Sequence, residues 1–146
     1  MRGLLAEILS SEADITVVDM EAGLEHLSRS GGTLRYVDHL LVIVEPYAKA
    51  VETARRTLVL AADLGIPRVS IVASKVRDIH EMDILERFCA ETGAELLASI
   101  PYDDEIRIAD REGLAPMDAA PKSAMVAAVT ALAEQLDSNW AKVPSA

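Results

Sequence analysis

The sequence predicts an α/β protein with a doubly wound, mainly parallel sheet and helices on both of its faces. Three observations predict this class. Four short apolar runs occur along the chain, at Ile15–Val18, Leu40–Val44, Val69–Ala73 and Leu96–Ile100. The runs are rich in β-branched residues and do not alternate with polar ones, which is typical of strands covered on both faces. They recur roughly every 27 residues, close to the ~30 residues of one strand–helix–strand unit, and segments with helical periodicity fill the intervals.

The helical segments are predicted from apolar spacing and from residues that start or stop helices. Residues 1–10 are expected to form an amphipathic helix and not a signal peptide, because Glu7 interrupts the apolar residues. The clearest helix spans about Ala48 to Leu64, with small and branched apolar residues on one face. Gly65 and Pro67 follow it in the usual order of a permissive C-cap and a breaker.

The second helix is predicted to begin after Asp78, whose carboxylate is suited to cap it. Glu81 stands three residues later as the reciprocal partner of a capping box. Gly93 ends this helix. Cys89, the sole cysteine, is expected on its inner face as a small apolar residue.

Two further helices complete the predicted domain. One follows Asp103 and stops at Gly113, and the last spans about Lys122 to Leu136. We therefore expect one α/β domain over residues 1–137 and a flexible tail over residues 138–146.

Composition narrows the classes of function. The chain has 146 residues, 51% of them apolar, and a formal net charge of -10. This charge opposes binding to nucleic acid or to an anionic membrane, and no run approaches the ~18 apolar residues of a membrane span. A single cysteine favours a reducing, cytoplasmic location. His26, His39 and His80 show no ligand spacing, so no metal site is predicted from them.

In doubly wound sheets, ligands bind beyond the carboxyl ends of the strands. The first predicted strand ends at Asp19, and a carboxylate there suits a hydrated magnesium ion. Gly23 permits the close backbone approach that a γ-phosphate-sensing loop needs. The alternative is that Asp19 only caps the next helix.

The ends of the later strands supply a second group of candidates. These are Ser74 and Lys75 after the third predicted strand, and Pro101, Tyr102 and Asp103 after the fourth. Pro101 and Tyr102 are suited to wall a flat ring. Taken alone, a structural role is favoured for each, with Lys75 solvated and Asp103 capping the following helix.

Longer strings carry a family resemblance. The segment Val17–Leu27, which reads VVDMEAGLEHL, resembles the switch II region of the carbon monoxide dehydrogenase nickel-maturation ATPases, the CooC family. These are deviant P-loop ATPases, a class that includes septum-site-determining and nitrogenase iron proteins. The resemblance spans about residues 4 to 136 and includes the segments Val37–Pro46, Val51–Ala54, Lys75–Asp78 and Ile100–Asp103.

The resemblance implies an ATP-driven dimer that assists nickel insertion into carbon monoxide dehydrogenase. It implies that Asp19 helps to hold magnesium through water and that Gly23 senses the γ-phosphate. It also implies that Ser74-Lys75 and Pro101–Asp103 border the adenine. Family members usually carry asparagine at the position of Ser74. Serine is shorter and offers no paired donor and acceptor to the base, which leaves base selectivity open.

The sequence departs from the family in two motifs. It contains no Gly-x-x-x-x-Gly-Lys-Ser/Thr phosphate loop and no Cys-x-Cys pair. We therefore expect this chain alone neither to bind ATP tightly nor to hydrolyse it. The alternative function is a non-catalytic interaction module that keeps the fold and dimer surface and regulates an intact paralogue.

The missing motif also has a consequence for the sheet. In the family fold, the phosphate-loop strand lies between the switch II strand and the strand represented by Leu40–Val44. Without it, Ile15–Val18 and Leu40–Val44 must pair directly, accept a strand from another chain, or leave unpaired backbone. A homodimer or a separately encoded N-terminal half is the expected partner, besides carbon monoxide dehydrogenase as the client.

Overall fold

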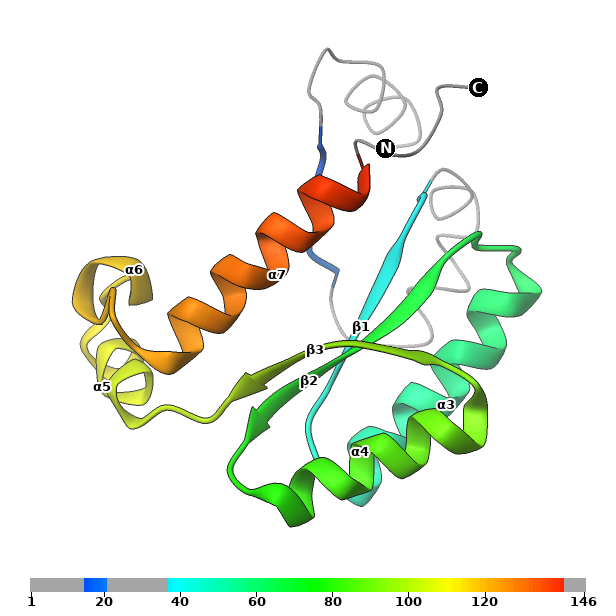
Figure 1. The fold of residues 1–146 in the computed structure, drawn as a ribbon, viewed down its shortest axis with the longest axis horizontal. Helices are drawn as coiled ribbons and strands as arrows, with labels where there is room; N and C mark the ends of the chain where they lie inside the picture. Colours follow the sequence, from blue (N-terminus) through cyan, green and yellow to red (C-terminus); the bar gives the residue numbers. More distant parts are fainter. Residues whose placement is uncertain (1–14, 21–36, 141–146) are drawn as a thin grey trace.

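The computed structural model describes residues 15–20 and 37–140 of the chain (Figure 1). Its described sheet has three parallel strands in the order β1-β2-β3. The strands are β1 (Leu40–Val44), β2 (Val69–Val76) and β3 (Glu95–Pro101). The last three predicted strands are therefore confirmed, with β2 and β3 longer than expected.

Helices alternate with these strands and continue after them. They are α3 (Ala48–Asp63), α4 (Ile79–Thr92), α5 (Asp104–Glu112), α6 (Pro116–Ala119) and α7 (Ala124–Trp140). The four predicted helices within residues 48–140 are confirmed, although α7 continues past the predicted end at Leu136. The short α6 was not predicted; it begins with Pro116, whose fixed φ favours the first helical position.

The sheet lies between two helical layers, as Figure 1 shows, with α3 and α4 on one face and α7 on the other. Successive residues of β2 point to opposite faces. Accordingly, Ile71 and Ala73 belong to the core under α3 and α4, whereas Val72 belongs to the core under α7. This arrangement confirms the predicted doubly wound class.

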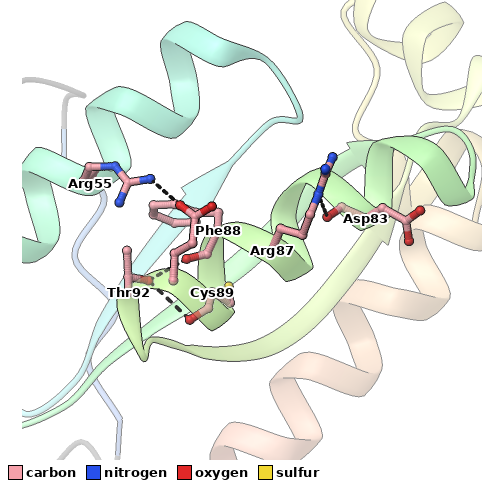
Figure 2. Close-up of polar contacts among 7 residues, drawn as sticks. Arg55, Asp83, Arg87, Phe88, Cys89 and Thr92 are labelled. Carbon is pink, nitrogen blue, oxygen red and sulfur yellow. Dashed lines mark hydrogen bonds and ion pairs between the residues drawn. The ribbon is translucent and has the colours of Figure 1, made fainter.

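The contact between α3 and α4 combines apolar packing with an exposed ion pair (Figure 2). Phe88 of α4 is buried, and the guanidinium of Arg55 from α3 lies 5.3 Å from its ring centroid. The same guanidinium donates to Glu91 at 2.9 Å. Cys89 is buried beside Phe88 as expected, and burial raises the pKa of its thiol. A buried thiol of raised pKa is a packing residue and not a nucleophile.

The predicted caps of α4 are present. Asp78 accepts a hydrogen bond from the backbone N–H of Glu81 at 2.9 Å, and Gly93 follows the helix with φ 72°. The Glu81 carboxylate accepts from the backbone N–H of Arg77 at 2.7 Å, one residue before the cap. The loop that connects β2 to α4 is thus fixed from both sides.

The prediction for Ile15–Val18 was wrong: this run forms no strand. It carries no ladder hydrogen bonds in the described structure, and Val17 is 87% exposed. Branched apolar residues favour a strand only where a neighbouring strand offers a paired, half-buried surface. Within the described residues β1 pairs with β2 alone, so no such neighbour is available. Direct pairing of Ile15–Val18 with Leu40–Val44 is therefore not observed in the described structure, and the other two alternatives stay predictions.

Candidate functional site

The carboxyl ends of the three parallel strands meet at one edge of the sheet, which we call the carboxyl edge and define by Glu45, Lys75, Arg77 and Tyr102. Glu45 directly follows β1, and Tyr102 directly follows β3. The backbone N–H of Tyr102 donates to the carbonyl of Val76 at 2.9 Å, which joins the ends of β2 and β3.

Lys75 occupies a β-bulge at the end of β2. Ser74 pairs with Ile100 and Val76 pairs with Pro101, so Lys75 is an extra residue with no partner in β3. Its φ is +57°, a left-handed conformation that costs a residue with a Cβ about 1–2 kcal/mol.

The bulge turns the Lys75 side chain toward β1. Its ammonium donates to the carboxylate of Glu45 at 2.7 Å, and this hydrogen bond raises the pKa of Lys75. Both side chains remain partly exposed. Because an exposed ion pair contributes only ~0–1 kcal/mol, it does not clearly offset the backbone strain. Strained residues of this kind cluster at ligand sites.

Arg77 lies on the opposite side of the same strand end, toward β3. Its guanidinium carbon is 4.3 Å from the centroid of the Tyr102 ring, a cation–π stack. Contact with Tyr102, and after it Tyr47, raises the pKa of Arg77. The Tyr102 hydroxyl also donates to Asp104 at 3.2 Å, while the Arg107 Nε donates to that carboxylate at 3.1 Å.

The structure brings together part of the predicted group. Ser74 is buried, with 9% exposure, inside β2, and Pro101 ends β3 opposite Val76. Tyr102 lies at the carboxyl edge. Lys75 also lies at this edge, but its side chain contacts Glu45 and not Tyr102. Asp103 has a structural role. One of its carboxylate oxygens accepts from the Glu105 N–H at 2.9 Å, and the other accepts from the Met125 N–H at 3.5 Å.

Asp19 lies apart from this group. It is exposed and follows the unpaired run. Its neighbour Met20 packs against the cluster of Ala61 and Ile66, which also contacts Leu40 and Val69 at the amino ends of β1 and β2. The structure therefore does not bring Asp19 together with the carboxyl edge. Gly23 lies outside the described residues.

Sequence reasoning missed Arg77 and Tyr47. The signal was present, because each comes within three residues of a strand end and thus near the ligand-binding edge. Tyr47 is half-exposed and precedes α3. A rule that collects every aromatic and cationic residue just after a strand would have included both.

The opposite, amino edge of the sheet holds a second polar network, made by His39, Arg68, Ser70 and Glu95. Ser70 has 0% exposure; its hydroxyl donates to Glu95 at 2.8 Å and lies 2.9 Å from His39 Nε2. Burial, and then Arg68, lowers the pKa of His39, while the Ser70 hydroxyl and then Arg68 lower that of Glu95.

The described part of the chain lacks two further kinds of feature. It contains no group of three or more His, Cys, Asp or Glu residues placed to hold a metal ion. None of its helices has the length and apolar character required to cross a membrane.

The resemblance seen in the sequence is supported by known relatives. The chain is 38% identical over 122 residues to the carbon monoxide dehydrogenase accessory protein CooC of Rhodospirillum rubrum, covering 83% of this chain. The chain is thus similar to the CooC accessory protein over most of its own length. An uncharacterised ATP-binding protein of Methanocaldococcus jannaschii is 36% identical over 106 residues, or 73% of this chain. The chain spans 44% and 40% of these two relatives. No family model matches it.

Solved structures confirm the fold. The septum site-determining protein MinD of Pyrococcus horikoshii, complexed with Mg-ADP, matches 97% of this chain with a TM-score of 0.72 and 20% identity, over 58% of its own length. A ParA family ATPase of Chlorobium tepidum matches 72% of this chain with a TM-score of 0.61 and 22% identity, over 44% of its own length. The chain thus has the layered architecture of these solved structures.

Proposed function

We propose that this chain is the base-binding part of an ATP-dependent accessory protein that assists nickel insertion into carbon monoxide dehydrogenase. The observation that carries the proposal is the carboxyl edge, where a strained lysine and a stacked arginine–tyrosine pair both lie at the end of β2, in a chain similar to CooC. A strain without a clear stabilising counterpart, at the edge where doubly wound sheets bind ligands, favours a binding role.

The cofactors proposed are ATP and magnesium. Magnesium keeps several waters and needs only one or two carboxylates. Asp19 is proposed to make such a water-mediated contact; it is exposed but lies apart from the carboxyl edge in this structure, so the proposal requires it to lie nearer that edge when nucleotide is bound. Gly23 is proposed to sense the γ-phosphate. Pro101 and Tyr102 are proposed to border the base.

We further propose that this chain alone binds Mg-ATP weakly, because its sequence has no phosphate loop. Charge-assisted hydrogen bonds to phosphate contribute about 1.5–3 kcal/mol each, so losing several weakens binding by well over about a hundredfold. Isothermal titration with Mg-ATP tests this, and a micromolar dissociation constant would contradict it.

The accessory role has its own test. Nickel-free carbon monoxide dehydrogenase is mixed with nickel and Mg-ATP, with or without this chain together with the amino-terminal half of CooC. We expect faster recovery of carbon monoxide oxidation when both polypeptides are present. Equal recovery with and without this chain would refute the role.

The second candidate function is a non-catalytic interaction module, which one observation favours. Within the described residues the outer side of β1 has no partner strand, and Ile43 in that strand is 57% exposed. An unpaired edge strand is a ready template for a strand from another chain. We propose that a second copy or a separately encoded amino-terminal half supplies it. Light scattering that shows a strict monomer, unchanged by the amino-terminal half of CooC, would exclude this.

A further inference from the structure

The side chains of the two cationic residues at the end of β2 point in opposite directions. Lys75 contacts Glu45 beyond β1, and Arg77 stacks on Tyr102 beyond β3. The bulge at Lys75 is the cause, because one extra residue changes which side of the strand each following side chain faces. Lys75 is therefore engaged away from Tyr102, and Arg77 is the cation beside the ring.

The Arg77 guanidinium is a flat, charged surface with one side on a tyrosine. Its side chain remains half-exposed, and its contact with Glu81 is a long 3.8 Å. Tyr47 also lies close enough to raise the pKa of Arg77. Two tyrosines and one arginine thus gather at the carboxyl edge, next to Pro101. Guanidinium planes and aromatic rings are the groups on which nucleic acid bases stack.

Selection between bases requires hydrogen bonds to the edges of the bases. The candidate residues Ser74 and Asp103 offer few free hydrogen-bonding groups for this purpose. Ser74 is buried within β2, and a hydroxyl cannot present a paired donor and acceptor. The carboxylate oxygens of Asp103 are engaged by the backbone N–H groups of Glu105 and Met125. Stacking by itself tolerates any base, because every base has a π-face.

We infer that Arg77, stacked on Tyr102 beside Tyr47, is the residue that binds the base of a purine nucleotide, and that it does so without selecting adenine over guanine. This inference rests on the proposed nucleotide-binding function. It assigns to Arg77 a base-stacking role at that site, without a role in choosing the base.

The test is an NMR titration of the full chain with AMP and, separately, GMP. We expect both to shift the resonances of Tyr102 and Arg77, with dissociation constants that agree within about threefold. Arg77→Ala is expected to weaken both by about tenfold. Arg77→Lys, which keeps the charge but loses the flat surface, is expected to weaken both as well.

Arg87→Ala is the matched control, because Arg87 is an exposed arginine on α4 whose Nε donates to the Asp83 carbonyl. It is expected to bind as the unchanged chain does. AMP binding without GMP binding, or unchanged binding by Arg77→Ala, overturns the inference and leaves nucleotide binding intact. Absence of binding by both nucleotides overturns the proposed nucleotide site itself and the inference with it.

Discussion

The two edges of the sheet are built in opposite ways. At the amino edge, the buried hydroxyl of Ser70 joins His39 before β1 to Glu95 of β3, so hydrogen bonds tie all three strands together. At the carboxyl edge, Lys75 adopts a left-handed backbone and its ion pair with Glu45 is exposed. One edge holds polar groups that are buried and satisfied, while the other holds strain and solvated charge.

The difference shows how stability and binding are divided within this fold. Buried hydrogen bonds are costly to lose, because an unsatisfied partner remains behind. Exposed ion pairs contribute little and are free to exchange partners. Hence the amino edge is suited to hold the strands in register, whereas the carboxyl edge is suited to receive a ligand.

The largest expected effect comes from breaking the amino edge. Ser70→Ala removes the hydroxyl between His39 and Glu95, so we expect the free energy of unfolding to fall by about 1–3 kcal/mol. Urea unfolding measures this. Ser99→Ala, at an exposed position of β3, is the control and should change stability by less than about 0.5 kcal/mol. Equal effects of the two substitutions would show that the network is unimportant.

Relief of backbone strain at the carboxyl edge should raise the free energy of unfolding, whereas breaking the amino edge lowers it. Lys75→Gly and Lys75→Ala both remove the ion pair with Glu45, but only glycine adopts φ +57° without cost. We expect the glycine variant to be more stable than the alanine variant by about 1 kcal/mol. Thermal or urea unfolding of the pair measures the strain alone. An alanine variant at least as stable as the glycine variant would argue against strain.

Acid should weaken the amino edge. The folded state lowers the pKa of His39 below its ordinary 6.5, so unfolded chains bind more protons. The stability that His39 contributes is complete above pH 6.5 and is lost as pH falls from 6.5 toward the lowered pKa. Glu95, also lowered, adds a loss below its ordinary 4.5.

Urea unfolding at pH 7.5 and 5.5 separates the histidine from the carboxylate. We expect the unchanged chain to lose stability between these values and His39→Gln to lose less. His80→Gln is the control, because His80 lies on the exposed surface of α4. A pH response that survives His39→Gln undiminished would assign it elsewhere.

The smallest expected effect is that of Glu45→Gln. The pair with Lys75 is exposed, so we expect a change in unfolding free energy of less than about 1 kcal/mol. A loss above about 2 kcal/mol would mean that the carboxyl edge is a structural element, and the contrast between the two edges would not hold.

Much of the fold was predictable because its signals are local. Leu40–Val44 is confirmed residue for residue, and the Asp78 cap and the Gly93 and Gly113 stops lie where they were expected. A cap needs only residues within one turn of the helix. By contrast, Ile15–Val18 has strand-like composition but no neighbour to pair with, and pairing is not encoded in the run itself.

The candidate site was only partly predictable for the same reason. The predicted strand ends indicated the carboxyl edge as the ligand-binding edge, and Tyr102 was therefore included among the candidates. The direction of Lys75 depends on a bulge that is defined by the pairing of β2 with β3. That pairing could not be read from the string Ser74–Asp78, and with it the placement of Arg77 was missed.

Asp103 joins the carboxyl edge to two helices. It follows Tyr102 directly, and its carboxylate accepts from backbone N–H groups in the first turns of both α5 and α7. Because α7 covers the face of the sheet opposite α3 and α4, a single carboxylate links the end of β3 to that helical layer.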